Sequence, residues 1–170
     1  LSFISIADAL GLNPEAVLSG LADFTGIDRR LTHKGCERGV TVLDDYAHHP
    51  TEISAFLSSV RELFPGKKIF GIFQPHLYTR TRDFAKEFGT SLSLLDELIL
   101  LDIYPAREEP LAGITSDVIF REVNLEEKVL IKNEQLLKVL QERDPEVLLT
   151  MGAGDIDRLV EPLKSWMEKR

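Results

Sequence analysis

Short apolar runs alternate with longer amphipathic stretches along most of the chain. The apolar runs are rich in Val, Ile, Leu and Phe, which is typical of strands buried on both faces. They predict strands at residues 31–37, 39–45, 68–73, 98–102, 128–131 and 146–150. The amphipathic stretches carry apolar residues three and four positions apart, and they predict helices at 50–63, 81–94, 115–122, 133–142 and 155–168.

Two further helices are predicted before the first strand, at residues 3–11 and 14–23. Gly11 suits the C-terminal end of the first helix, and Asn13 followed by Pro14 suits the start of the second. The first two strands are separated only by Arg38 and Gly39, which predicts an antiparallel hairpin.

From residue 39 onward, strands and helices alternate, which predicts an α/β fold with right-handed crossovers. We expect a Rossmann-like, doubly wound and mostly parallel sheet with an antiparallel N-terminal hairpin strand, preceded by a short helical segment. Sheets of this kind bind ligands at the carboxyl ends of their strands.

Polar residues cluster in four loops that each follow a predicted strand and precede a predicted helix. These loops are residues 44–49, 74–80, 102–109 and 152–155. Because the carboxyl ends of parallel strands lie along one edge of the sheet, we expect the four loops to form one site.

The loop DDYAHHPTE, residues 44–52, is the richest in candidate chemistry. Pro50 begins a helix with Glu52 in its first turn, so free backbone N–H groups beside the two imidazoles suit an anion. Asp44 and Asp45 at the strand end suit the hydroxyls of a ribose or a hard cation. The two adjacent histidines lack the HxH or HxxxH spacing of a zinc site, which disfavours zinc.

Two other loops add a cation and a glycine-rich turn. In QPHLYTRT, residues 74–81, Arg80 is the expected clamp for a carboxylate or phosphate, because a guanidinium binds such groups bidentately. MGAGD, residues 151–155, lacks the full GxGxxG of a dinucleotide site. The sequence also contains no GxxxxGK[ST] loop for holding phosphates.

Composition limits the kinds of partner. A formal net charge of −8 argues against a nucleic-acid binder, and no apolar run approaches the roughly 20 residues of a membrane span. Cys36 is the single cysteine, which excludes an internal disulfide and fits a cytoplasmic location. Because the sequence starts Leu1-Ser2-Phe3 without a methionine, we expect it to be part of a longer protein.

Five motifs carry a family resemblance. They are GIDRRL (26–31), DDYAHHPTEI (44–53), FQPHLYTRT (73–81), YPAREEP (104–110) and MGAGDI (151–156). In this order they resemble the C-terminal domain of the bacterial Mur ligases. Tyr46 and Glu52 favour the alanine-adding branch of that family over the branch that recycles murein tripeptide.

The resemblance implies an ATP- and magnesium-dependent ligase of peptidoglycan synthesis. In this chemistry the carboxylate of UDP-N-acetylmuramate is phosphorylated, and the amine of L-alanine attacks the acyl phosphate. The resemblance implies that residues 1–27 are the tail of a central ATPase domain and a hinge, and that residues 28–170 are the C-terminal domain. Its partners would be the protein's own N-terminal and central domains, without which the chain is expected to be inactive.

The resemblance also implies roles for individual residues. Arg30 and Asp45 would bind ATP, with Asp45 on the ribose, and no metal ligand is expected in this chain. The amino-acid and acyl-phosphate side would be lined by Tyr46, His48, His76 and Arg80, of which His48 and Arg80 would be catalytic. Asp44 and His49 would be supporting residues.

The sequence departs from the family at two positions. Leu77 stands where the family often has arginine, and Thr32 stands where it often has Glu or Gln. The first departure removes a cation from the predicted amino-acid pocket.

Without the family resemblance, the residues are also compatible with two other kinds of function. One is a stand-alone nucleotide-binding or regulatory module of the same fold. The other is a metal-dependent hydrolase using His48, His49 and His76, which the histidine spacing disfavours.

Overall fold

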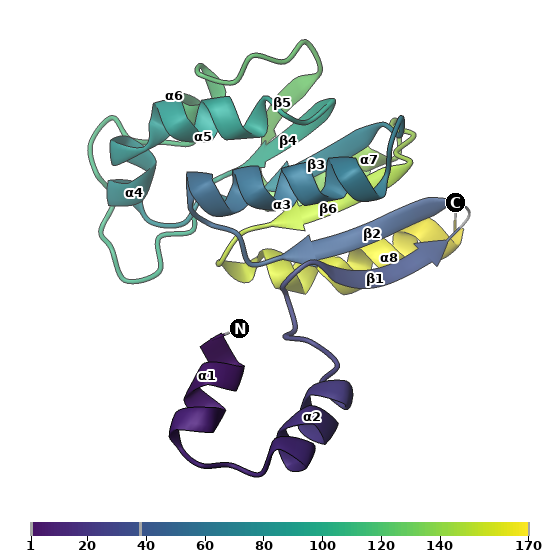
Figure 1. Cartoon of the computed structure of the whole chain (residues 1–170). Coiled ribbons are helices and arrows are strands. Elements are labelled where there is room, and N and C mark those ends of the chain that lie inside the picture. The colour runs from purple at the N-terminus through teal and green to yellow at the C-terminus, as the bar shows by residue number, and fades with distance from the viewer. Residues whose placement is uncertain (1, 38, 170) are drawn as a thin grey trace.

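A six-stranded sheet forms the centre of the computed structural model, which describes residues 2–37 and 39–169 (Figure 1). The strand order is β1-β2-β6-β3-β4-β5. β1 pairs antiparallel with β2, and every other neighbouring pair is parallel. The strands are β1 (Thr32–Glu37), β2 (Val40–Asp45), β3 (Ile69–Phe73), β4 (Glu97–Leu101), β5 (Lys128–Ile131) and β6 (Val147–Met151). The predicted fold class is therefore confirmed.

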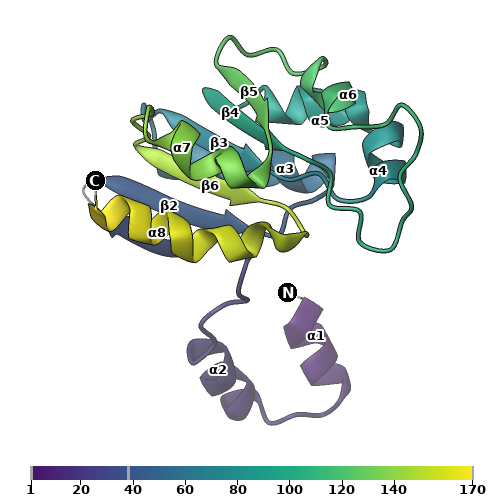
Figure 2. The same ribbon diagram turned by 180° about the vertical axis from the view of Figure 1, so that it is seen from behind.

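Helices cover both faces of the sheet. On one face lie α3 (Pro50–Leu63), α5 (Ala85–Leu92) and α6 (Asp117–Phe120), with the short α4 (Tyr78–Asp83) at the end of the same layer (Figure 1). The opposite face carries α7 (Leu136–Leu140) and α8 (Val160–Lys169) (Figure 2). The sheet is therefore doubly wound, as the alternating pattern predicted.

Two apolar layers make the core. Along β3, Ile69 and Phe73 pack beneath α3 and α5, whereas Phe70 and Ile72 pack beneath α7 and α8. This alternation follows from the two-residue period of a strand, and it explains why β3 is buried at every position. Burial of each large side chain contributes about 1.5–3 kcal/mol, so the sheet has its own stabilising core.

Three helix predictions need correction. Residues 81–94 do not form one helix, because the backbone leaves helical geometry at Phe84 (φ −121°, ψ 19°), where its ring packs against the His49 ring at a centroid distance of 4.9 Å. The helices predicted at 133–142 and 155–168 each begin with a tighter 3₁₀ turn, η1 (Asn133–Gln135) and η2 (Asp155–Leu159). Of the predicted hairpin turn, Arg38 lies outside the described residues.

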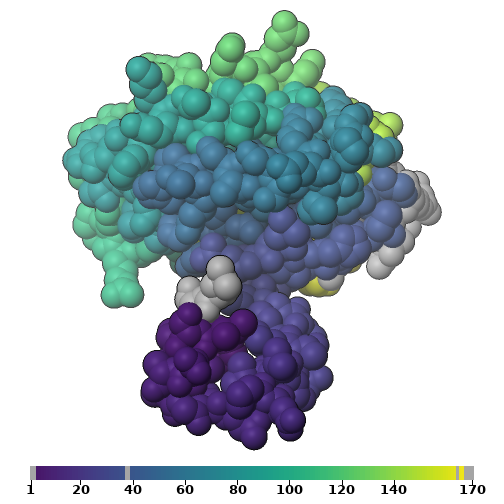
Figure 3. All heavy atoms as spheres, in the orientation of Figure 1, coloured from purple at the N-terminus to yellow at the C-terminus, as the bar shows by residue number. Residues whose placement is uncertain are grey.

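The N-terminal helices form a separate lobe, seen in purple in Figure 3. They are α1 (Ser2–Ala9) and α2 (Pro14–Ala22), and Asn13 caps α2 by accepting the Glu15 N–H at 2.8 Å. An apolar cavity of about 190 Å³ lies between them. Large apolar side chains remain exposed on and beside this lobe: Phe3, Ile4, Ile6, Leu10, Leu12, Leu18, Leu21, Phe24 and Ile27.

Within residues 2–37 and 39–169, no helix has the length and apolar character that a membrane crossing requires.

Candidate functional site

The parallel register brings three of the predicted polar loops together. At the carboxyl edge of the sheet, Asp45 of β2 lies beside Met151 of β6, which in turn lies beside Phe73 of β3. The loops that follow these strands are therefore neighbours. The loop after β4 joins them, because His76 and Tyr104 form an isolated parallel bridge.

Asp44 holds the linker that precedes the sheet. Its side chain is 1% exposed and accepts hydrogen bonds from Arg29 Nε at 3.0 Å and Thr150 Oγ1 at 2.6 Å. The same guanidinium donates from Nη2 to the Gly152 carbonyl at 2.6 Å. A partly buried ion pair between Asp44 and Arg29 thus joins the linker to β2, and the hydrogen bonds to Thr150 and Gly152 join both to the end of β6.

Asp45 faces the other side of β2 and also binds backbone. Its two oxygens accept the Leu31 N–H at 2.6 Å and the Ala47 N–H at 2.8 Å. Burial raises the pKa of Asp45, and these two donors offset only part of that effect. Each carboxylate oxygen keeps a lone pair for a further donor such as a ribose hydroxyl.

A capping box starts α3 at the two histidines. Glu52 Oε2 accepts the N–H groups of His48 at 3.0 Å and His49 at 3.2 Å, and His49 Nδ1 accepts the Thr51 N–H at 3.4 Å. Burial by itself would raise the pKa of Glu52. The hydrogen bond from the His48 N–H, the charge of a protonated His48 ring and the charge of Arg30 together lower that pKa more, so Glu52 stays ionised.

The His48 ring is held by its own loop. Its Nδ1 lies 2.9 Å from the Tyr46 carbonyl oxygen and 3.3 Å from Glu52 Oε2. Tyr46 is 37% exposed, and its ring meets the His48 ring edge-on at a centroid distance of 5.1 Å. The guanidinium groups of Arg29 and Arg30 lie 5.2 and 5.8 Å from the Tyr46 ring centroid. Arg30 Nη1 also lies 3.7 Å from Glu52 Oε1, so Arg30 lies beside Tyr46 and Glu52 at an exposed rim.

His76 and Arg80 complete the cluster from the loop after β3. Arg80 Nη1 lies 3.4 Å from His76 Nδ1, and the rings of His48 and His76 are 5.9 Å apart. Burial lowers the pKa of His76, and the charge of Arg80 lowers it further. His76 is therefore favoured in its neutral form, beside a permanent cation.

Tyr104 forms the wall behind His76. Their rings stack at 5.8 Å with an interplanar angle of 20°, and the Leu77 N–H donates to the Tyr104 carbonyl at 3.0 Å. On the Gly154 side there is no room for a side chain, because a Cβ there would lie 2.6 Å from Tyr104 Cγ. Tyr104 is thus packed between an imidazole and a glycine.

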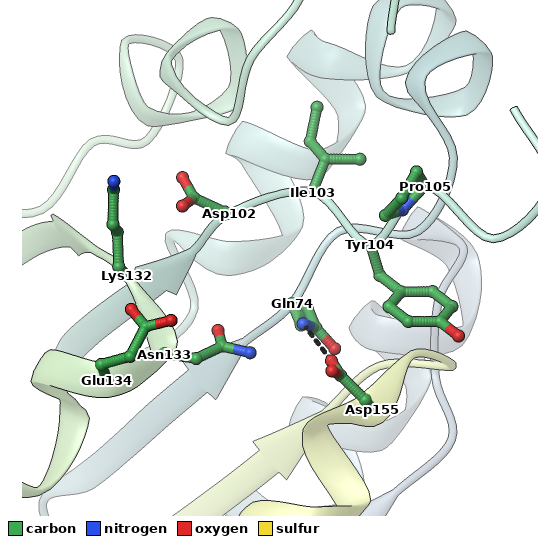
Figure 4. A pocket seen from close by; sticks show the side chains of 9 residues that line it. All are labelled: Gln74, Asp102, Ile103, Tyr104, Pro105, Lys132, Asn133, Glu134 and Asp155. Atoms are coloured by element: carbon green, nitrogen blue, oxygen red, sulfur yellow. Dashed lines mark hydrogen bonds between the residues drawn. The ribbon is translucent and has the colours of Figure 1, made fainter. Parts of the chain in front are cut away.

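Beyond Tyr104 lies a cavity of about 420 Å³ (Figure 4). Gln74 Nε2 donates to Asp155 Oδ1 at 2.8 Å across its floor, and Gln74 Oε1 accepts the Ile156 N–H at 3.0 Å. The cavity is lined by Gln74, Asp102, Ile103, Tyr104, Pro105, Lys132, Asn133, Glu134 and Asp155. The MGAGD turn is therefore tied to the loop after β3 through Gln74.

The predicted site residues fall into three groups. The structure brings Tyr46, His48, His76 and Arg80 into one cluster, places Arg30 at its rim, and uses Asp44, Asp45 and His49 in hydrogen bonds within the chain. Leu77 lies at the start of α4 with a left-handed backbone (φ 74°), and Thr32 lies on β1. In the described part of the chain, no group of three or more His, Cys, Asp or Glu side chains could hold a metal ion.

Three contributors were not predicted as site residues. Arg30 was predicted as a site residue and Arg29 was not, because the spacing in DRR does not say which guanidinium turns inward. Glu52 was predicted only as an acidic residue in the first turn of the helix. A capping box with His49 as the N-cap would have predicted its hydrogen bonds to the backbone N–H groups. The contact of Tyr104 with His76 joins loops far apart in the sequence, so no local signal predicts it.

Comparison with known proteins identifies relatives along nearly the whole chain. The UDP-N-acetylmuramate--L-alanine ligase of Parabacteroides distasonis is 53% identical over 167 residues, which cover 98% of this chain and 36% of that protein. The enzyme of the same name from Phocaeicola vulgatus is 49% identical over 168 residues, covering 98% and 37%. The chain thus spans about a third of the length of these curated relatives.

Solved structures agree with the fold. The UDP-N-acetylmuramate-alanine ligase of Thermotoga maritima superposes with a TM-score of 0.74 at 28% identity, covering 98% of this chain and 36% of that one. An isolated domain of a putative UDP-N-acetylmuramate:L-alanyl-gamma-D-glutamyl-medo-diaminopimelate ligase from Haemophilus ducreyi superposes at 0.62 and 21% identity. The superposition covers 81% of this chain and 99% of that domain. The second likeness concerns the fold alone.

The family itself is shown by residues 29–154, which match the family described as Mur ligase, glutamate ligase domain. This range contains the loops at 44–49, 74–80 and 102–109 and most of the loop at 152–155, and it confirms the resemblance carried by the five motifs. The chain therefore belongs to the Mur ligase, glutamate ligase domain family.

Proposed function

We propose that this chain is the C-terminal part of an ATP-dependent ligase that adds L-alanine to UDP-N-acetylmuramate in peptidoglycan synthesis in the cytoplasm. The observation that carries the proposal is the cluster of His48, His76 and Arg80 at the carboxyl edge of the sheet. Relatives that share about half of its residues carry that enzyme's name.

The chemistry needs positive charge and hydrogen-bond donors beside a transferring phosphoryl group and a carboxylate. Arg80 supplies a guanidinium that suits the carboxylate of the amino acid or an acyl-phosphate oxygen. Tyr46 and the two imidazoles border the same space. On the outer side, Arg30 and Asp45 are assigned to the nucleotide, with Asp45 offering its remaining lone pairs to the ribose.

The phosphates and magnesium are assigned to a preceding domain. The sequence has no GxxxxGK[ST] loop, and the described residues include no cluster suited to a metal ion. Magnesium bound with ATP neutralises charge on the phosphates. This chain's own residues would bind and orient the amino acid and close over the nucleotide.

Residues 1–27 are assigned to the end of that preceding domain and a hinge. Support comes from the apolar side chains of the α1–α2 lobe, most of which are exposed, and from the family match, which starts at residue 29. A lobe with so much exposed apolar surface suits packing against a further domain.

The test is a ligation assay with the full-length protein, UDP-N-acetylmuramate, ATP and a panel of amino acids. We expect L-alanine to be joined with release of ADP and phosphate, and the 170-residue chain alone to be inactive. A preference for an L-alanyl tripeptide would place the protein in the tripeptide-recycling branch instead. Ligation by the isolated chain would contradict the assignment of the ATP phosphates to another domain.

Two arginines of α4 make a matched pair of variants for this assay. Arg80→Ala removes the guanidinium beside His76 and should lower kcat/KM on the order of 100-fold or more. Arg82→Ala removes an exposed guanidinium that pairs with Asp83 at 2.7 Å, and it should leave kcat/KM within about twofold of the unaltered protein. Equal effects of the two changes would contradict the role of Arg80.

A further inference from the structure

The hydrogen-bond partners of His48 decide where its proton lies. His48 Nδ1 is 2.9 Å from the carbonyl oxygen of Tyr46. A carbonyl oxygen only accepts, so Nδ1 must carry the hydrogen. The second group near Nδ1 is the Glu52 carboxylate at 3.3 Å, which is also an acceptor. A neutral His48 therefore has its lone pair on Nε2.

The partner of His76 has the opposite chemistry. His76 Nδ1 is 3.4 Å from Arg80 Nη1. A guanidinium only donates, so this contact is a hydrogen bond when Nδ1 is the bare nitrogen that accepts. A neutral His76 therefore carries its hydrogen on Nε2. The lowered pKa of His76 favours this neutral form over the doubly protonated ring.

Neighbouring groups keep both rings in these orientations. Glu52 holds the backbone N–H groups of His48 and His49, which fixes the loop that carries the first ring. The second ring is stacked on Tyr104, which has Gly154 at its back. Glu52 and Tyr104 are thus positioning residues, one for each imidazole.

We propose that His48 and His76 are held in opposite neutral tautomers, so that His48 accepts a proton at Nε2 while His76 donates a hydrogen bond from Nε2. The proposal rests on the proposed ligase function, and it gives the two histidines of that site different roles. His48 is the base for the incoming amino acid. His76 is the donor to an oxygen of the acyl phosphate or of the amino-acid carboxylate.

With these two roles, each proton that the ammonium group of L-alanine loses has a defined acceptor. The ammonium group of L-alanine gives one proton to His48 Nε2 and becomes a neutral amine. The amine nitrogen forms a bond to the acyl carbon, and the bond from that carbon to the phosphate oxygen breaks. The second proton of the nitrogen leaves with the phosphate. The new charge on His48 lies beside Glu52, whose carboxylate stabilises it at Nδ1.

The direct test is nitrogen-15 NMR of the histidine rings in this 170-residue chain, at about pH 8, where an ordinary histidine is neutral. The sheet has its own core, and the isolated domain from Haemophilus ducreyi shows that the fold crystallises without other domains. The sequence has four histidines, and His33→Gln, His48→Gln and His76→Gln each identify one set of signals by its loss.

We expect the His48 ring to show its hydrogen on Nδ1 and the His76 ring to show its hydrogen on Nε2. His49 serves as an internal comparison, because its Nδ1 accepts the Thr51 N–H and its hydrogen should lie on Nε2. A hydrogen on Nε2 of His48, or on Nδ1 of His76, overturns the proposal. This result does not depend on any enzyme activity, so it stands apart from the proposed function.

Glutamine variants of the full-length protein test the two roles. A glutamine side chain offers an N–H donor near the position of Nε2 but has no basic nitrogen. His76→Gln should therefore keep kcat/KM within about tenfold, whereas His48→Gln should lower it by about 100-fold or more, the usual contribution of a general base. Equal losses, or the reverse order, overturn the division of roles. If the unaltered protein ligates no alanine, the proposed function fails and the tautomers are judged by NMR.

Discussion

The loops after β2 and β3 each present one histidine to the site, but they hold it in different ways. The loop after β2 relies on neighbours in sequence, because His48 contacts Tyr46 and Glu52 within four residues. The loop after β3 also uses a neighbour in sequence, since Arg80 lies 3.4 Å from His76 Nδ1, but the face of the His76 ring stacks on a distant residue, Tyr104 from the loop after β4. Behind Tyr104 lies Gly154 from the loop after β6.

The two histidine rings of one site are therefore oriented by different kinds of contact. A local capping box orients a side chain as soon as the helix forms. A stacked ring is oriented only when three loops have reached their final places on the sheet. His76 should therefore be sensitive to remote changes that leave His48 in place.

The largest effect is expected from Gly154→Ala. The new Cβ would lie 2.4 Å from Gln74 Oε1 and 2.6 Å from Tyr104 Cγ, so the Tyr104 ring must move and release His76. In the full-length protein kcat/KM should fall by about 100-fold, since a displacement of about 1 Å has that cost. The free energy of unfolding should fall by about 1–3 kcal/mol from the overpacking.

The control is Gly20→Ala in α2, where an added Cβ has no neighbour within 4 Å. In the 170-residue chain it should raise the free energy of unfolding by about 0.5–1 kcal/mol, the opposite of the loss expected from Gly154→Ala. Unaltered ligation by the Gly154→Ala protein would show that the packing of Tyr104 does not reach the chemistry.

A smaller effect is expected from Tyr104→Leu. This change removes an aromatic stack of about 0.5–1.5 kcal/mol and should lower kcat/KM by about tenfold. Tyr104→Phe keeps the stacking face and should behave like the unaltered protein. If both variants lose the same activity, the hydroxyl of Tyr104 and not its ring is the group that acts.

On the local side, Glu52→Ala should lower the free energy of unfolding by about 1 kcal/mol, the value typical of a lost helix cap. Denaturation in urea measures this change. Glu62→Ala in the same helix, at an exposed position, should lie within about 0.5 kcal/mol of the unaltered protein. A stable Glu52→Ala protein would contradict the capping box as the support of His48.

The smallest effect concerns pH. The pKa of His76 is lowered from its ordinary value of 6.5, so the unfolded chain binds a proton at higher pH than the folded chain does. Its contribution to stability is complete above about pH 6.5 and is lost as the pH falls through the folded pKa. The stability of His76→Gln should therefore decline less between pH 7 and pH 5, as measured by urea denaturation at about these two values. An identical decline in both proteins would contradict the lowered pKa.

Much of the fold was predictable because its signals are local and periodic. The run 50–63 was predicted with the bounds of α3, since a proline start and helical spacing agree there. Phe84 interrupts the next predicted helix, and its ring contacts His49, a residue of another loop. Periodicity within one segment does not contain such a contact.

The candidate site was likewise predictable only in part. The sheet rule alone placed the loops after β2, β3, β4 and β6 at one edge, because parallel strands share a direction. It did not separate Arg29 from Arg30, since burial of one guanidinium depends on Asp44 and the Gly152 carbonyl across the edge. The pairing of Tyr104 with Gly154 likewise exists only in the folded sheet.

The central claim is that these two loops build a single site. The most direct measurement is kcat/KM for His48→Ala, His76→Ala and the double variant of the full-length protein with L-alanine as the acceptor. If the histidines act together, the double variant should lose little more than the more damaging single variant, because residues that act as a unit are strongly non-additive. Losses that multiply, with the double variant reduced by the product of the two single effects, would contradict the claim.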